Sequence, residues 1–182
     1  MFHKLAKLAL IIIISYQTPL HSKSTSFNEI NAKDLSNYFS GIVAFENKEN
    51  SNALKFLNSS KILINKHDQY LKRYVYSLVL ENRVSQSVNI IKNRSEENNI
   101  DFFDAYLLLI IDSLKKNNFK EIEKNLKKIK KLNETDRLHP VIIGILENFI
   151  YTFDKKEILY NQISYGNISL ISQAFQRCYL KK

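Results

Sequence analysis

The chain has 182 residues, of which 45% are apolar and 25% charged, and this composition indicates a folded domain or short array rather than a disordered chain. Its 3 Gly and 2 Pro are too few for the many tight turns of an all-β sandwich or barrel, so long helices are expected. A single Cys excludes an internal disulfide framework and a cysteine-based zinc site. The formal net charge of +9 is weak evidence for a nucleic-acid partner, because no recognisable nucleic-acid-binding module accompanies it.

The first two dozen residues have the layout of a secretory signal peptide. Lys4 and Lys7 give a positive start, 8–16 is an apolar run, and 22–24 (Ser-Lys-Ser) is a small-x-small cleavage site. The run is shorter than the roughly 18 to 20 apolar residues that a spanning helix needs. We therefore expect export to the periplasm or cell envelope of a Gram-negative-type bacterium, with residues 1–24 as a signal peptide or, alternatively, as an uncleaved N-terminal anchor.

Beyond this segment the sequence predicts an all-α domain at 31–182, because apolar residues recur at helical spacing. The predicted helices are 33–47, 51–63, 69–81, 84–94, 101–116, 119–132, one starting near Leu138, 154–163 and 167–180. They group into antiparallel pairs at about 33–65, 68–99, 101–134 and 138–164, with a final helix at 167–180. Asn31 and Asp68 are suited to cap two helix N-termini, and Pro140 falls in a first turn, where it interrupts no helix hydrogen bond.

The second helices of successive pairs repeat at intervals of 34 and 35 residues. The residues that would begin these helices are Asn50, Val84 and Phe119, and those at an equivalent place further along are Ala53, Ser87 and Ile122. A helix pair that recurs at this interval is the signature of a solenoid, in which a pair buries its apolar face only by stacking on its neighbours.

These residues resemble the tetratricopeptide repeat family. The first pair matches best, with small and large residues at the packing positions of the family, namely Gly41, Ala53, Leu57 and Ser60. A small residue in one helix lets the paired helix approach closely, and a large one fills the groove beside it. The second pair keeps Ser87 and Ile91 but has Val75 in place of the glycine, whereas the third keeps the turn at 117–120 and has the larger Ile122 at a small position.

The resemblance covers residues 33–153, and it departs from the family where Asn37 and Asn65 stand in place of a Trp and a Pro. It implies a right-handed superhelical solenoid of antiparallel helix pairs, whose first helices line a concave groove for an extended peptide or a partner helix. The predicted partner-binding residues are Tyr38, Ile42, Phe45, Lys72, Tyr76 and Asp104, accompanied by Val79, Leu107 and Ile111. Aromatic side chains would anchor the partner, and Lys72 and Asp104 would add charge selectivity. The alternative is that each of these side chains packs against a neighbouring helix.

The most charged predicted helix, 119–132, carries its lysines on the side opposite its apolar residues. They are Lys120, Lys124, Lys127, Lys128, Lys130 and Lys131. Such a face usually serves solubility, and its alternative role is a weak contact with an anionic membrane surface. This gives a second functional hypothesis, a membrane-surface protein tethered by its N-terminal helix and by this Lys-rich face.

No sequence pattern indicates catalysis, a cofactor or a metal site. The glycines are scattered, so no phosphate-binding loop is expected, and His67 and His139 stand apart from carboxylates at metal-ligand spacing. Cys178 is expected to be a buried small hydrophobe. The sequence therefore predicts a non-enzymatic protein–protein interaction or assembly module with a protein or peptide partner and no nucleic acid.

The last predicted helix leaves two alternatives open. Either its polar residues form the outer cap that ends a solenoid, or a further repeat follows it. The polar residues concerned are Ser169, Ser172, Gln173, Gln176 and Arg177.

Overall fold

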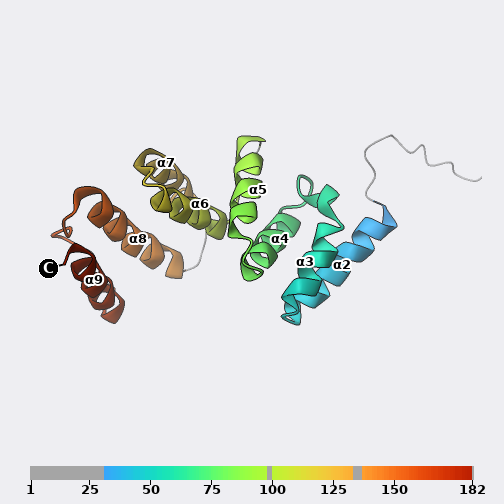
Figure 1. The fold of residues 1–182 in the computed structure, drawn as a ribbon, viewed down its shortest axis with the longest axis horizontal. Coiled ribbons are helices and arrows are strands. Elements are labelled where there is room, and N and C mark those ends of the chain that lie inside the picture. The colour runs from blue at the N-terminus through green and yellow to red at the C-terminus, as the bar shows by residue number, and fades with distance from the viewer. Residues whose placement is uncertain (1–30, 98–99, 133–136, 182) are drawn as a thin grey trace, which may run out of the picture. The chain divides into compact units, whose positions relative to one another are not determined.

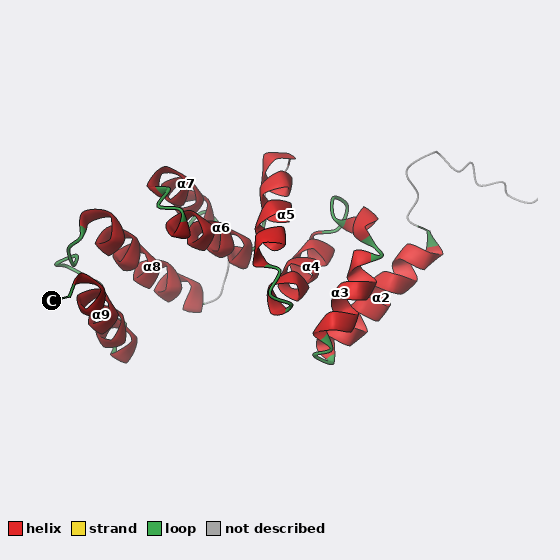
Figure 2. Ribbon diagram, in the orientation of Figure 1, coloured by secondary structure: helices red, strands yellow, loops and turns green. Residues whose placement is uncertain are grey.

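The computed structural model describes residues 31–97, 100–132 and 137–181, and within them the chain forms eight α-helices and no strand. Figure 2 shows these helices joined by loops, which confirms the all-α prediction. The chain divides into two units after Asn31, and the fold described below is that of the second unit, Ala32–Lys182. The predicted signal peptide, residues 1–24, lies outside the described residues.

Figure 1 labels the helices in chain order. They are α2 (Ala32–Glu46), α3 (Asn50–Asn58), a 3₁₀ turn η1 (Lys61–Leu63), α4 (Asp68–Leu80), α5 (Val84–Glu97), α6 (Phe103–Lys115), α7 (Phe119–Ile129), α8 (Leu138–Lys155) and α9 (Asn167–Leu180). Each helix from α2 to α6 packs on the next one, and α8 packs on α9. The second helices of the first three pairs begin at the residues that the repeat predicts, Asn50, Val84 and Phe119.

The turn inside each of the first three pairs has the same geometry. Lys48, Asn82 and Asn117, which are 34 and 35 residues apart, all adopt a left-handed backbone with φ of 62°, 58° and 53°. The residue after each donates its N–H to the carbonyl five positions earlier, as Glu49 does to Ala44 at 2.9 Å. This is the Schellman pattern, which satisfies the last carbonyls of the first helix. The repeat is therefore present in the backbone as well as in the sequence.

Close packing within the first pair depends on a residue without a side chain. A Cβ built on Gly41 would lie 2.9 Å from Cγ and Cδ2 of Leu57, so only glycine lets α3 come this near to α2. Ala53 and Leu57 of α3 are fully buried, and the Ser60 hydroxyl donates to the carbonyl of Asp34 at 2.9 Å. The four positions of the family resemblance in this pair thus all lie at the contact between the two helices.

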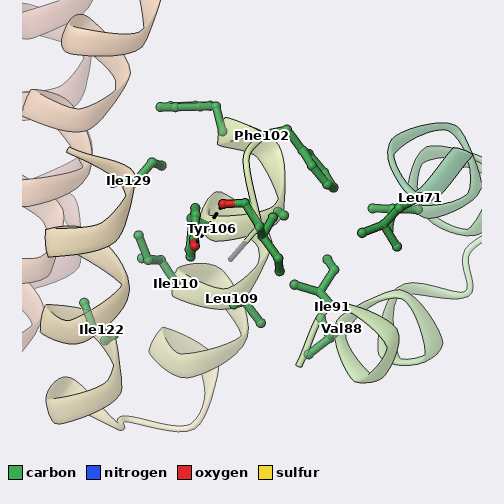
Figure 3. Close-up of a cluster of buried hydrophobic side chains, with 13 residues drawn as sticks. Leu71, Val88, Ile91, Phe102, Tyr106, Leu109, Ile110, Ile122 and Ile129 are labelled. Carbon is green, nitrogen blue, oxygen red and sulfur yellow. Dashed lines mark hydrogen bonds between the residues drawn. The ribbon is translucent and has the colours of Figure 1, made fainter. Parts of the chain in front are cut away.

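Most of the buried apolar residues that the structure describes belong to two clusters. The first cluster joins α2, α3 and α4 and consists of Tyr38, Leu54, Leu57, Leu63, Tyr70, Tyr74 and Leu78. The second joins α4 to α7, and Figure 3 shows Leu71 from α4, Val88 and Ile91 from α5, Leu109 and Ile110 from α6, and Ile122 and Ile129 from α7 meeting there. Ile64 and Ile90 pack against both clusters. Each pair therefore completes its core with residues of the next pair.

Two predicted helix limits are wrong near the end of the first pair. The predicted helix 51–63 ends at Asn58, because the carbonyl of Leu57 accepts the Tyr70 hydroxyl and the chain turns through Ser59 and Ser60. The N-cap of α4 is His67 and not Asp68, since Nδ1 of His67 accepts the N–H of Tyr70 at 3.2 Å. Pro140 lies in the first turn of α8, as predicted.

The predicted helix at 154–163 is also wrong. Helix α8 continues to Lys155 and ends where Lys156 adopts a left-handed backbone, with φ 59°. Residues 157–166 contain no helix, and Tyr160 is 99% exposed, so the apolar residues of this segment do not form a buried helical face. Polar contacts fasten the segment instead, including the Tyr165 N–H to the Ser169 hydroxyl at 2.7 Å. Helix α8 consequently pairs with α9 rather than with 154–163.

Candidate functional site

Three of the predicted partner-binding residues form a line across the first helices of three successive pairs. The rings of Phe45 on α2 and Tyr76 on α4 lie 6.4 Å apart between centroids. The Tyr76 hydroxyl donates to Oδ2 of Asp104, which stands in the first turn of α6. All three side chains are half-buried, so each keeps part of its surface in solvent. We call Phe45, Tyr76 and Asp104 the aromatic–acid row.

The other predicted partner-binding residues, Lys72, Ile42 and Tyr38, differ in how far they are buried. Lys72 is half-buried, and its Nζ lies 6.0 Å from the centroid of the Phe102 ring. Ile42 is half-buried against the first core cluster. Tyr38 is only 5% exposed and stacks obliquely on Tyr70 at 5.6 Å, so it is a core residue and does not fit the predicted role of an exposed anchor. Of the accompanying residues, Ile111 is exposed, whereas Val79 and Leu107 are half-buried.

The row offers apolar contact area beside opposite charges. Half-exposed aromatic rings bury large areas on binding at a low cost in conformational entropy. The carboxylate of Asp104 and the ammonium group of Lys72 would favour a partner with charged groups of matching sign. No reacting group is required for such recognition.

No family model, curated protein or solved structure matches this chain. Its resemblance to the tetratricopeptide repeat family therefore rests on its own residues and stays a prediction.

The Lys-rich face of α7 is partly engaged within the protein. Lys124 pairs with Glu121 at 3.2 Å, Lys130 pairs with Glu147 of α8, and Nζ of Lys128 lies 5.8 Å from the Tyr106 ring centroid. The side of α7 that faces the core contains Ile122 and Ile129, as predicted, but also Asn125, whose Nδ2 donates to the Glu121 carbonyl at 2.9 Å. Lys120, Lys127 and Lys131 are exposed.

A shared carboxylate ties α5 to α6. Oδ2 of Asp112 lies 2.9 Å from Nζ of Lys92 and 2.8 Å from Nζ of Lys116. Burial alone would raise the pKa of Asp112, but hydrogen bonds from Lys116 and Lys92 outweigh it, and the net direction is downward. The two lysines are substantially exposed, so solvent weakens both pairs.

Replacing Asp112 by Asn is expected to lower the free energy of unfolding by about 1 kcal/mol at pH 7. A carboxyl whose pKa is lower in the folded state adds stability above its unfolded pKa, about 3.9, and loses it as pH falls further. Urea unfolding of the wild type should therefore show a stability loss below about pH 4 that is reduced in the variant. Glu123→Gln, a change at an exposed carboxyl of α7, is the control and should leave the pH 7 value nearly unchanged.

A pocket of about 310 Å³ lies beside α8. The sequence did not predict it. Its lining is mainly apolar and includes Phe103, Ile129, Leu132, Pro140, Ile143 and Ile163. The ring of Tyr165 reaches one wall because Gly144 has no Cβ, which would lie 2.3 Å from the Tyr165 hydroxyl oxygen. Gly144 is the sequence signal for this close contact with Tyr165. The contact was not predicted, because the segment before Tyr165, 154–163, was expected to form a helix.

Within 31–94, 100–132 and 137–181, the remaining titratable side chains do not converge on one site. His139 stacks on Phe103, with ring centroids 3.9 Å apart and planes 5° from parallel, and His67 caps α4. Cys178 is exposed, so the prediction that it is buried is wrong. Over the described ranges, His, Cys, Asp and Glu side chains do not gather in groups of three that would hold a metal ion. Among the helices that the structure describes, none is long and apolar enough to cross a bilayer.

Proposed function

We propose that this chain is a non-catalytic binding module of the tetratricopeptide-repeat type, exported to the periplasm or cell envelope, which holds an extended peptide or helix along the aromatic–acid row. The observation that carries the proposal is the contact of Phe45, Tyr76 and Asp104 in line, one from each of three successive pairs. The core residues of successive pairs also meet, but they are buried, whereas these three side chains are half-buried and keep surface that a ligand could contact. The repeated turn geometry supports the solenoid part of the proposal.

The spacing of the row suggests the form of the ligand. Packed helices lie about 8 to 10 Å apart, and an extended chain advances about 3.3 Å per residue. One pair would therefore meet about every third residue of an extended peptide. We expect the bound peptide to place an apolar or aromatic residue against Phe45 and Tyr76. A basic residue about three positions further along the peptide would face Asp104.

The membrane-surface hypothesis ranks second. Contacts within the protein already engage three of the six lysines of this Lys-rich face, four of which lie on α7 and two just after it. The three remaining lysines, at about 1 kcal/mol each near an anionic surface, would supply a weak attachment without a second anchor. Washing membranes with carbonate and with high salt would separate integral from electrostatic attachment.

Peptide selection followed by substitution tests the role of the row. Peptides selected by display on the purified chain would be titrated against variants by fluorescence anisotropy. Phe45→Ala is expected to weaken binding at least about tenfold, because an anchoring ring is removed from a contact that excludes water. Val84→Ala removes an exposed apolar side chain at the start of α5, a helix that contributes no residue to the row, and should leave binding unchanged. Equal binding by Phe45→Ala and wild type would refute the assignment of the row.

The mass and cellular fraction of the full chain in a two-membrane bacterium test the proposed export. We expect loss of about two dozen residues and release by osmotic shock. A full-length product in the membrane pellet would favour the tethered form, and a full-length product in the cytosol would contradict export.

A further inference from the structure

Helix α9 presents its polar side to the protein and its apolar side to solvent. Its buried residues are Ser169, Ser172 and Gln176. Oε1 of Gln176 accepts the amide of Gln162 at 3.0 Å and lies 3.3 Å from the Thr152 hydroxyl of α8, while its Nε2 donates to Ser172 at 3.1 Å. Ser169, Ser172 and Gln176 were among the polar residues expected to form an outer cap that faces solvent. They are buried instead, so this alternative is wrong for these three residues.

The opposite side of α9 is a continuous apolar face. Ile171, Ala174, Phe175 and Cys178 follow the i, i+3, i+4, i+7 spacing of one helix side, and Leu170 lies one turn before Ala174; all five are exposed. Leu170 and Phe175 are 65% and 64% exposed. A contiguous face of large apolar residues is what a helix uses to contact another protein surface. We call these five residues the α9 face.

A second exposed apolar surface lies at the other end of the same unit, on α2. A hollow of about 570 Å³ there is lined by Ser36, Phe39, Ser40, Val43, Ala44, Asn47, Glu49 and Phe56. Its lining includes the small residues Ser36, Ser40 and Ala44, while Phe39 and Val43 are 60% and 61% exposed. We call it the α2 hollow.

The repeat identifies what kind of surface the α2 hollow is. The residues that stand 34 positions after Ser36, Ser40 and Ala44 are Tyr70, Tyr74 and Leu78 on α4. All three are fully buried in the first core cluster, together with Tyr38, Leu54 and Leu57 of the preceding pair. These positions on α4 are therefore the ones that receive the preceding helix pair. The same positions on α2 form a hollow that receives nothing within the described residues of the unit.

We propose that the α2 hollow of one chain receives the α9 face of a second copy, so that chains associate head to tail. The large side chains Ile171 and Phe175 suit a hollow whose lining includes the small residues Ser40 and Ala44. The two helices also match in length, with 15 residues in α2 and 14 in α9. The charges are complementary, because Glu49 lines the hollow whereas α9 has no acidic residue and carries the exposed Arg177.

This contact is heterologous, because two different surfaces of the same chain meet. Two associated chains leave one α2 hollow and one α9 face free, so association can continue into longer chains, or these two surfaces can meet and close a ring. The inference goes beyond the proposed peptide binding and does not rest on it, since the aromatic–acid row belongs to neither surface.

Two single variants and their mixture test the proposal on the full purified chain. Phe39→Glu disables the α2 hollow, and Phe175→Glu disables the α9 face. Both residues are exposed, so neither change buries a charge in the folded monomer. We expect the wild type to self-associate in sedimentation velocity, with either variant alone weakened at least about tenfold. An equimolar mixture of the two variants should form a 1:1 heterodimer, because the intact hollow of one meets the intact face of the other.

The matched control is Leu80→Glu, the same change at a 52% exposed residue of α4, and it should self-associate as the wild type does. Self-association of Phe39→Glu with loss only in Phe175→Glu would mean two-fold pairing of α9 with α9 and would overturn the proposal. A wild type that stays monomeric up to about 1 mM would overturn it as well. So would a monomer that binds phosphatidylglycerol vesicles through Phe175, since the α9 face would then belong to a membrane.

Discussion

Replacing Gly41 by Val is expected to lower the free energy of unfolding by about 3 kcal/mol. A Cβ at this position would already lie 2.9 Å from Cγ and Cδ2 of Leu57 and 3.3 Å from its backbone nitrogen. Leu57 of α3 is fully buried and packs in the first core cluster with residues of α2 and α4, so a shift of its side chain disturbs that cluster. The added side chain must therefore push α3 away from α2 and disturb the first core cluster. Urea unfolding followed by circular dichroism measures the loss.

A double-mutant cycle with Leu57 separates this clash from a general effect of Val in a helix. Leu57→Ala alone should cost about 3 kcal/mol, because it leaves a cavity in a closed core. If the two residues collide, Gly41→Val in the Leu57→Ala background should cost at least 1 kcal/mol less than in the wild type. Additive losses would contradict the contact as the cause. A smaller substitution, Gly41→Ala, should cost about 1 kcal/mol, since its better helix propensity offsets part of the overlap.

The repeat and its turns could be predicted because they depend on local chemistry. The starts of α3, α5 and α7 follow from polar breaks between apolar runs, and these breaks contain Lys48, Asn82 and Asn117 in the same left-handed conformation. Asn adopts this conformation at lower cost than most residues. The packing role of Gly41 and Ala53 could likewise be predicted, because small residues at paired positions indicate close helix packing.

The orientation of single side chains could not be predicted from the same pattern. Apolar residues occupy more than one side of α2, so periodicity does not separate Tyr38, which is buried, from Phe39, which is 60% exposed. The aromatic–acid row was predicted residue by residue from the family resemblance, but the contact of the Tyr76 hydroxyl with Asp104 depends on how successive pairs stack. That geometry is tertiary and leaves no local signal.

The inverted orientation of α9 contradicts the usual rule that the apolar side of a helix faces the core. Here α8 supplies Asn148 and Thr152 at its buried positions, and Gln162 of the connecting segment lies beside them. These groups need hydrogen-bonding partners once they leave water. Gln162 accepts from the Asn148 amide, and Gln176 of α9 accepts from Gln162 and from the Thr152 hydroxyl. The sequence shows that α9 has a polar and an apolar side, but it does not show which of the two packs against α8.

Replacing Gln176 by Ala is expected to detach α9 from α8, with a local loss of about 2 to 3 kcal/mol. Gln176 is fully buried, and its amide links Gln162, Thr152 and Ser172. Its removal leaves the Gln162 amide without this acceptor and also opens a cavity. Because α9 packs mainly on α8, and each element of a repeat array depends chiefly on its neighbours, the loss should stay at this end.

Hydrogen exchange measured by mass spectrometry distinguishes this local loss from global unfolding. In Gln176→Ala, amides of α9 should exchange at least tenfold faster, while those of α4, which carries fully buried Tyr70 and Tyr74, keep their wild-type protection. Gln173→Ala, at a half-buried neighbouring position, is the matched control and should change little. Gln176→Leu fills the volume but provides no hydrogen bonds, so it should still expose α9, to a smaller extent than Ala. Wild-type protection of α9 in Gln176→Leu would mean that packing, and not the polar network, holds this helix in its inverted orientation.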